Sequence, residues 1–482
     1  MKRYFLIIGL IFIFIIVAIV VATNMQSNDA NDEFFVYVKD NSLILWNERN
    51  NEKIVLNSNF DSSKEMFLDI HFAYSFDKTK IIYPYNISDN SVSLRYADIN
   101  NISEENSQLI DDGVLLYEIV KNGLVYIKDM NLYHYDFNDK QMIAENITAY
   151  AVSNDKNTLY YLLENGDAYQ ISLDSLEEFK ILSNIDGINV YGDIVLSYIK
   201  ENNLFSLYVD DELISDKVIN ILGEEDNVLY FTKYEGKLTN FENSEDLVDL
   251  NSNVATYRYK DGDVTKLGDG ILNLGNGFTN ANTDEYLVLG KYNGTNFDIS
   301  FYNQKEDYVF SLGSTDKYNI YGYDDATKTV YYQGADDLFY QATLSGKELE
   351  NIKLIGENIA IITKENNNIY YIENNTSNLY LLQDEENVLI AKNIKDWFII
   401  DNILYYIKNN EDKLSLNCYQ CNMQEITNID SFSNINDQIF YFADTYLKDD
   451  VLHGNLYTVI NGVNVLVDDD VIVSYGVIHL NY

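Results

Sequence analysis

A short hydrophobic strand that ends in tyrosine recurs along most of this 482-residue chain, and no other feature restricts the fold as much. Runs of about five to seven residues that alternate apolar and polar side chains are separated by Asn, Asp and Gly clusters, which is typical of strands and turns. The 42 Tyr and 23 Phe suit half-buried sheets, and with only Pro84 as proline the turns rely on Asn, Asp and Gly. The copies of the strand are KIIYPY (80–85), GLVYI (123–127), TLYYLL (158–163), NVLYFT (227–232), TVYYQG (329–334), NIYYIE (368–373), ILYYIK (403–408) and QIFYFA (438–443).

Each copy belongs to a larger repeating unit. A second strand follows within a few residues, as in NLYHYDF, DAYQISL, DLFYQATL, NLYLLQD and NLYTVI, and a third, shorter one closes the unit. In full, residues 358–392 contain the strands AIIT, IYYI, LYLL and VLIA. Four short antiparallel strands per repeat are how a propeller blade is built. The sequence therefore predicts an all-β protein, a β-propeller built of four-stranded antiparallel blades.

The number of rings follows from the strand spacing. It implies about ten or eleven blades, whereas single rings typically hold four to eight. We therefore expect two rings, a first propeller over residues 34–250 and a second over 251–482, divided within the irregular stretch 233–270. The alternative is one ring over residues 34–482. In either arrangement the first unit lacks a strand and residues 471–482 are an extra segment, so pairing of these two parts would close a ring.

Two turns resemble those of a known repeat. They open the stretches SFDKTKIIY (75–83) and SNDKNTLYY (153–161), with DDATKTVYY (324–332) as a looser third. In each, an Asp-headed turn would bond its own backbone. These units resemble TolB-type (dipeptidyl-peptidase-N-terminal-like) propeller repeats, whose blades begin with a Ser-Pro-Asp-Gly-like turn, although the Pro and Gly are missing here. The resemblance implies the fold more than an activity, because such propellers serve both as binding scaffolds and as caps on peptidases.

The N-terminal region predicts a membrane anchor. Residues 5–22 are an unbroken apolar run, which as a helix spans about 27 Å and matches a bilayer core. Lys2 and Arg3 should keep residues 1–4 in the cytoplasm under the positive-inside rule, so that everything after a linker of residues 23–33 is extracytoplasmic. We expect a single-pass cell-membrane protein. The alternative is a signal peptide cleaved before Thr23.

The chain is strongly acidic, with 76 Asp and Glu against 33 Lys and Arg and a formal net charge of −43. That field repels phosphate backbones, so nucleic acid is excluded as a partner. We interpret most acidic side chains as solvating turns and protecting strand edges. Attraction of a basic partner or of cations is the alternative.

No recognisable catalytic or metal motif occurs. The Gly-x-Ser-x-Gly elbow, the Walker loop and the Gly-x-Gly-x-x-Gly turn are all missing, so no catalytic residue is predicted and binding residues are not assigned. The histidines His71, His134, His453 and His479 stand singly, without the spacing of a zinc site. We expect no cofactor, with calcium as an alternative at the acidic stretches 210–212, 261–263 and 468–470, which otherwise are solvated turns.

The only two cysteines, Cys418 and Cys421, flank the two residues of a tight turn between strands. An extracytoplasmic location permits a disulfide between them. Two free thiols are an equal alternative. A redox pair is disfavoured, because no thioredoxin-like βαβ pattern surrounds them.

These observations lead to a function only at the level of class. The first hypothesis is a non-catalytic, membrane-anchored propeller that binds or scaffolds a protein or glycan ligand, with exposed Tyr beside Asp and Asn as contacts. The alternative is a hydrolase of cell-wall polymer or peptide, for which carboxylates with raised pKa values should converge in a propeller mouth. A sensor that signals inward is disfavoured, because only four residues precede the apolar run.

Overall fold

The computed structural model describes most of the chain from Phe34 to His479 as strands joined by short turns. It also contains two 3-10 turns, η1 (Ile99–Asn101) and η2 (Val473–Tyr475). Within these described parts, no helix is both long enough and apolar enough to cross a membrane. The predicted anchor of residues 5–22 and linker of residues 23–33 lie outside them. The described residues are 34–61, 72–88, 91–201, 204–225, 227–237, 249–250, 252–272, 286–292, 297–303, 308–315, 319–324, 327–334, 336, 338–346, 348–365, 368–373, 375–383, 386–410, 413–460 and 462–479.

Most strands form antiparallel groups of four that follow chain order. Six groups are separate sheets, and within each the neighbours in space are neighbours in sequence. Their strands are β4 (Ala73–Tyr74), β5 (Lys80–Ile87), β6 (Val92–Asp98), β7 (Gln108–Val114); β8 (Leu116–Val120), β9 (Gly123–Lys128), β10 (Asn131–Tyr135), β11 (Lys140–Ala144); β12 (Ile147–Val152), β13 (Thr158–Leu163), β14 (Ala168–Ser172), β15 (Glu178–Leu182); β23 (Ile271–Leu272), β24 (Tyr286–Tyr292), β25 (Phe297–Asn303), β26 (Tyr308–Thr315); β27 (Asn319–Asp324), β28 (Thr329–Gln333), β29 (Leu338–Ser345), β30 (Glu348–Glu357); and β31 (Ile359–Glu365), β32 (Asn368–Glu373), β33 (Asn378–Gln383), β34 (Glu386–Ala391).

The remaining strands form two larger sheets, one of seven strands and one of eleven. In these, β19 and β38 are long enough to be the last strand of one group and the first strand of the next. The seven strands are β16 (Gly187–Tyr191), β17 (Ile194–Glu201), β18 (Leu204–Val209), β19 (Glu212–Glu225), β20 (Val228–Tyr234), β21 (Val254–Lys260) and β22 (Asp263–Asp269). The eleven are β1 (Phe34–Lys39), β2 (Ser42–Asn47), β3 (Glu52–Asn57), β35 (Ile394–Ile400), β36 (Ile403–Asn410), β37 (Lys413–Cys418), β38 (Ile426–Ile435), β39 (Gln438–Lys448), β40 (Val451–Ile460), β41 (Val463–Ile472) and β42 (Ile478–His479).

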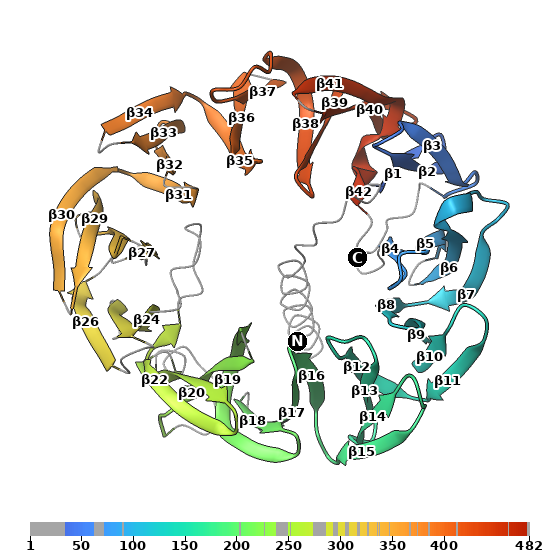
Figure 1. Cartoon of the computed structure of the whole chain (residues 1–482), viewed down its shortest axis with the longest axis horizontal. Coiled ribbons are helices and arrows are strands. Elements are labelled where there is room, and N and C mark those ends of the chain that lie inside the picture. The colour runs from blue at the N-terminus through green and yellow to red at the C-terminus, as the bar shows by residue number, and fades with distance from the viewer. Residues whose placement is uncertain are drawn as a thin grey trace.

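The groups stand one after another around a ring, in the manner of propeller blades (Figure 1). Eleven clusters of buried hydrophobic residues account for this arrangement, because each lies between two consecutive groups and the last joins β39 and β40 to β1 and β2. Figure 1 shows a single ring. This is the arrangement expected as the alternative, one ring over residues 34–482, and it differs from the two rings that were expected first. The described part of the stretch that the sequence marked as irregular contains the end of β20 and all of β21 and β22, and β20 pairs with β21 across the expected boundary between residues 250 and 251.

The recurring tyrosine strand is the second strand of its group, as β5, β9, β13, β20, β28, β32, β36 or β39. It is buried on both faces, and β13 shows why. Leu159 and Tyr161 belong to the cluster shared with the preceding group, whereas Tyr160 and Leu162 belong to the cluster shared with the following one. A strand packed on both faces needs a continuous apolar run, so the same few letters recur at each position in the ring.

The two ends of the described chain meet in one group. Strand β42 pairs antiparallel with β1, with Phe35 opposite His479 and Val36 opposite Ile478. The first group thus receives its fourth strand from the end of the chain, as the sequence predicted. This pairing closes the ring between residues that are more than 400 positions apart in sequence.

A cluster of side chains reinforces the closure, and we call it the closing clasp. Asp468 of β41 accepts hydrogen bonds from Tyr37 Oη (2.5 Å) and Lys39 Nζ (2.8 Å), both on β1, and forms an ion pair with Lys53 of β3 (3.0 Å). Its side chain is only 9% exposed. Burial opposes ionisation of Asp468, but the two lysines and the tyrosine outweigh it and lower its pKa to about 2.

The same arrangement occurs once more inside the ring, as the internal clasp. Asp111 of β7 accepts hydrogen bonds from Tyr126 Oη (2.8 Å) and Lys128 Nζ (2.7 Å) of β9, and from Lys140 Nζ (2.6 Å) of β11. Burial again opposes ionisation and is again outweighed, so the pKa of Asp111 is also lowered to about 2. In both clasps an aspartate of one outer strand holds the second and fourth strands of the next group.

Candidate functional site

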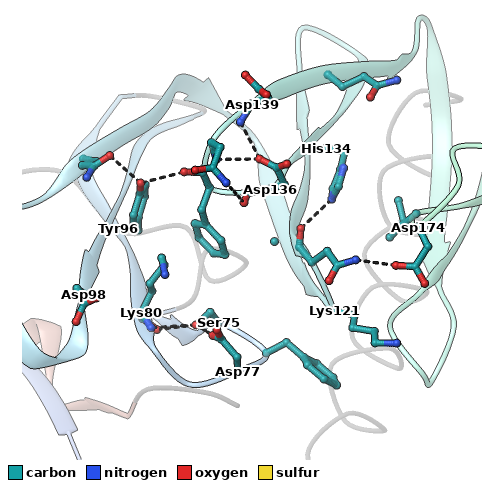
Figure 2. Close-up of a pocket in the computed structure, with 18 of the residues that line it drawn as sticks. Ser75, Asp77, Lys80, Tyr96, Asp98, Lys121, His134, Asp136, Asp139 and Asp174 are labelled. Carbon is teal, nitrogen blue, oxygen red and sulfur yellow. Dashed lines mark hydrogen bonds between the residues drawn. The ribbon is translucent and has the colours of Figure 1, made fainter.

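A polar hollow of about 960 Å³ lies over the groups β4–β7, β8–β11 and β12–β15. In an antiparallel group, the turn between the first and second strands and the turn between the third and fourth emerge on the same face of the ring. The hollow is formed by such turns, from neighbouring groups, as Figure 2 shows. Its lining residues are Ser75, Phe76, Asp77, Lys80, Tyr96, Asp98, Asn101, Asn106, Gln108, Lys121, Asn122, Gly123, His134, Asp136, Phe137, Asn138, Asp139, Gln141, Leu173, Asp174 and Leu176.

One wall is the turn between β4 and β5, which the sequence identified. Ser75 Oγ donates to Asp77 Oδ1 (2.7 Å), the backbone N–H of Thr79 donates to the same oxygen (3.1 Å), and the N–H of Lys80 donates to Ser75 Oγ (3.0 Å). Lys78 has a φ of 57° at the position where the family pattern has Gly. Partial burial of Asp77 works against its charge, but these hydrogen bonds hold its pKa below the ordinary value.

The turn before β13 repeats this geometry. The N–H of Asn157 donates to Asp155 Oδ1 (3.0 Å), the N–H of Thr158 donates to Ser153 Oγ (2.9 Å), and Lys156 has a φ of 58°. The prediction that both Asp-headed turns bond their own backbone is therefore confirmed.

The opposite wall is the turn between β10 and β11. Asp136 Oδ1 accepts the backbone N–H groups of Asn138 (2.8 Å) and Asp139 (2.7 Å). Between them Phe137 has a φ of 69°, an unusual conformation for a bulky residue. Its ring lies edge-on to that of Tyr96, with 5.1 Å between centroids, and the Lys80 ammonium lies 5.2 Å from its centroid. The hydrogen bond from the Asp139 N–H, followed by that from Asn138, lowers the pKa of Asp136.

A third wall consists of His134, Asn122 and Asp174 (Figure 2). His134 Nε2 lies 3.2 Å from the carbonyl oxygen of Asn122, and the imidazole is only 7% exposed. Burial lowers the pKa of His134, so the ring is neutral near pH 7. Asp174 accepts from Asn122 Nδ2 (2.7 Å) and from Asn157 Nδ2 (2.9 Å). His134 is thus a packed strand side chain, as the sequence favoured, but it also lines the hollow.

Two carboxylates of the hollow, Asp77 and Asp136, are held in the ionised form. The hydrolase hypothesis required Asp or Glu with raised pKa values in one concave site. In the described part of the chain, each Asp or Glu whose pKa departs from the ordinary value has it lowered, and in the hollow this holds for Asp77 and Asp136. Such groups stay ionised and accept hydrogen bonds, but they do not deliver a proton at neutral pH.

The other residues singled out by sequence lie elsewhere. Cys418 ends β37 and Cys421 lies in the turn after it, far along the chain from the hollow. Their Cα atoms are 5.8 Å apart and their sulfur atoms are within bonding reach, so a disulfide there stays a prediction that the geometry permits. His453 is buried and forms a pair with Asp470 (2.7 Å), while His71 lies outside the described residues. For His479 only the backbone is described, paired with Phe35.

The acidic stretches expected as solvated turns or calcium ligands divide into two kinds. Asp210, Asp211 and Asp261 have positive φ angles in turns between strands. Asp468, by contrast, belongs to the closing clasp, where lysines take the place of a cation. The described residues contain no group of three or more His, Cys, Asp or Glu placed to hold a metal ion. Calcium binding stays an untested alternative.

Sequence reasoning did not find the hollow. The Ser-x-Asp turn at residues 75–80 was the only local signal, and it marks one wall. The other walls come from turns on other groups, such as 136–139 and 173–176, whose letters resemble ordinary solvated turns. These turns meet only because three strand groups are neighbours in the ring, and that arrangement is not visible in any local stretch of sequence.

Comparison with known proteins gives no family. No protein-family model matches the chain, and no curated protein matches it. Among solved structures, the computationally designed protein Ika8 matches at 13% identity, with 66% of this chain and 95% of that chain covered and a TM-score of 0.26. PorZ, a surface component of the type-IX secretion system of Porphyromonas gingivalis, matches at 12% identity, with 90% and 71% covered and a TM-score of 0.24. BamB from Moraxella catarrhalis matches at 10% identity, with 64% and 94% covered and a TM-score of 0.27.

Proposed function

We propose that this chain is a membrane-anchored, extracytoplasmic propeller that binds a protein or glycan ligand in the hollow over β4 to β15 and does not act on it chemically. The observation that carries the proposal is the hollow itself. It is a concave site of about 960 Å³, within the range of ligand pockets, and its lining combines aromatic rings with amides and ionised carboxylates.

Three further observations support this assignment. The apolar run of residues 5–22 with Lys2 and Arg3 before it is the basis for the membrane location. The net charge of −43 makes nucleic acid and anionic lipid surfaces poor partners for the body of the protein. The two Ser-x-Asp turns, with a positive φ at Lys78 and Lys156, match what a TolB-type repeat requires of its Pro-Asp-Gly turn, which supports that kinship.

The test is capture from the cell envelope. Purified residues 23–482 are immobilised and exposed to solubilised envelope extract, and retained proteins and glycans are identified by mass spectrometry. The same experiment is run with Gln141→Trp, which adds a large side chain at an exposed position in the hollow, and with Gln383→Trp, an exposed glutamine at the end of β33 outside it. We expect Gln141→Trp to abolish retention of the ligand and Gln383→Trp to leave it unchanged. Equal retention by all three proteins would exclude the hollow as the binding site.

A further inference from the structure

Six amide side chains line the hollow, those of Asn101, Asn106, Gln108, Asn122, Asn138 and Gln141. Each amide carries two donor hydrogens and an acceptor oxygen, so it can bond to a hydroxyl group in either direction. Tyr96 Oη donates to Gln108 Oε1 (2.7 Å), which leaves the exposed Gln108 Nε2 group to face a ligand. A ligand that is dense in hydroxyl groups satisfies such a lining better than one dominated by apolar or charged groups.

The negative charges of the hollow do not by themselves select a cation. Of the five aspartates in its lining, Asp77, Asp98, Asp136 and Asp174 each accept hydrogen bonds from the protein, so their charges are partly satisfied internally. Lys80 and Lys121 stand in the same hollow. Lys80 also occupies the position over the Phe137 ring where a guanidinium or ammonium group of a ligand would stack. A cationic peptide would therefore meet a site whose cation–π position is already filled.

Phe76 supplies an open aromatic face at the rim. It follows Ser75 in the Asp-headed turn, at the position where the family pattern has Pro, and 52% of its surface is exposed. The turn is fixed by the bonds of Ser75 and Asp77, so the ring is presented by a rigid segment. An aromatic face in contact with the C–H face of a pyranose, beside amides and carboxylates that bond its hydroxyl groups, is a complete set of contacts for one sugar residue.

We infer that the occupant of the hollow is a neutral oligosaccharide segment that packs on Phe76 and bonds the surrounding amides and carboxylates. The inference rests on the proposed function and specifies its ligand class. Carboxylates with lowered pKa values accept the hydroxyl hydrogens and the amides and lysines donate to hydroxyl oxygens. Because the ligand carries no charge, its binding should depend only weakly on salt.

The test uses isothermal titration calorimetry of purified residues 23–482 with soluble hexasaccharides of β-1,4-glucose, α-1,4-glucose, β-1,4-xylose and β-1,4-N-acetylglucosamine, and with hexa-arginine. Each titration is run at low and at 0.5 M salt. We expect at least one hexasaccharide to bind with an affinity that changes less than about threefold with salt. Phe76→Ala should weaken that binding about three- to tenfold, and Phe76→Trp should retain it.

The matched control is Phe179→Ala on β15. Phe179 is also an exposed phenylalanine, 61% exposed, but it is absent from the lining of the hollow. Its replacement should leave binding unchanged, and circular dichroism checks that each variant is folded. Equal weakening by the two alanine variants, or no binding of any hexasaccharide, would overturn the inference. Salt-sensitive binding of hexa-arginine that Phe76→Ala removes would overturn the glycan class but leave the hollow as a binding site. If Gln141→Trp retained the same envelope ligand as the unmodified protein, the proposed function itself would be overturned.

Discussion

The closing clasp and the internal clasp have the same chemistry but join different kinds of neighbours. Asp468 and Asp111 each hold a tyrosine and two lysines, and their side chains are 9% and 10% exposed. The internal clasp joins Asp111 to Lys128, 17 residues away, whereas the closing clasp joins Asp468 to Lys39, 429 residues away. The chain itself keeps the internal partners close together. At the closure, side chains, β42 and the pairing of Lys39 with Val471 of β41 do so instead, and these contacts restrict far more conformational freedom because they join distant parts of the chain.

Each interface also has polar contacts besides its clasp, and at the internal one Tyr96 Oη donates to the carbonyl oxygen of Phe137 (3.3 Å). At the closure, Lys448 pairs with Asp470 of its own group (2.9 Å) and reaches Asp40 on the far side of the interface (3.3 Å), while His453 Nδ1 lies 2.7 Å from Asp470. The junction between the two ends of the described chain is thus joined by polar contacts as well as by strand pairing.

The largest effect should come from removal of β42. A chain that ends at Ile472 loses the β1–β42 pairing and the buried Val477, and we expect a loss of roughly 3 kcal/mol or more in the free energy of unfolding. Urea denaturation followed by circular dichroism measures it. The control is a chain that ends at His479, which keeps β42. Identical urea midpoints for the two proteins would show that β42 does not hold the ring closed.

The second prediction compares the two aspartates directly. Asp468→Ala and Asp111→Ala should each lower the free energy of unfolding by about 2–3 kcal/mol, because each removes the acceptor of a buried tyrosine hydroxyl and a carboxylate bonded by two lysines. We expect the loss at Asp468 to be larger by about 1 kcal/mol, since its partners can separate once the clasp is gone. Equal losses would mean that β42 and the hydrophobic cluster close the ring without help from the clasp.

The third prediction concerns acid. The pKa of both aspartates is about 2 in the folded protein and near the ordinary value of 3.8 when unfolded. Their contribution is therefore fully present above about pH 4 and is lost as the pH falls from 4 to 2, by about 2 kcal/mol per clasp. Unfolding measured at pH 5 and pH 3 should show a smaller decrease for Asp468→Asn than for the unmodified protein. A decrease of the same size in both would exclude ionised Asp468 as its source.

The smallest effects should come from two lysine–aspartate ion pairs that join neighbouring strand groups without a tyrosine. Lys233 pairs with Asp216 (2.6 Å) and Lys291 pairs with Asp269 (2.7 Å), again from one strand group to the next. These aspartates are 60% and 48% exposed, so we expect Lys233→Met and Lys291→Met to cost less than about 1 kcal/mol each. Lys39→Met in the closing clasp should cost more than either. Thermal unfolding of the three variants tests this order.

The sequence predicted the parts of the fold that local patterns control. The tyrosine strands were found because strands packed on both faces keep an apolar run, and the pairing of residues 471–482 with the first unit followed from a missing strand. The first expectation of two rings was wrong. It rested on the usual number of blades in one propeller, which argued against a single large ring. The number of blades in a ring depends on how wide each strand group is at its outer edge, and the sequence of a single strand does not reveal that width.

Side-chain contacts between strand groups could not be predicted from local sequence patterns. Residues 36–40 read VYVKD and residues 125–129 read VYIKD, so half of each clasp is visible as a repeat. The aspartate that completes it lies on the preceding group, and for β1 that is the last group of the chain. Asp468 was therefore interpreted as part of a solvated turn. The hollow depends in the same way on turns from three groups, so its residues could not be assembled from the letters.

The pairing of β1 with β42 also sets the order in which this protein can be completed. The sheet of β1, β2 and β3 is made first, yet its inner edge stays without a partner until residues 478 and 479 have emerged from the ribosome. Contacts of such long sequence separation are slow to form, so the first strands are exposed to mispairing for the whole time of synthesis. A nascent chain stalled before Val477 should accordingly remain sensitive to proteases at its beginning, even when its middle groups are folded.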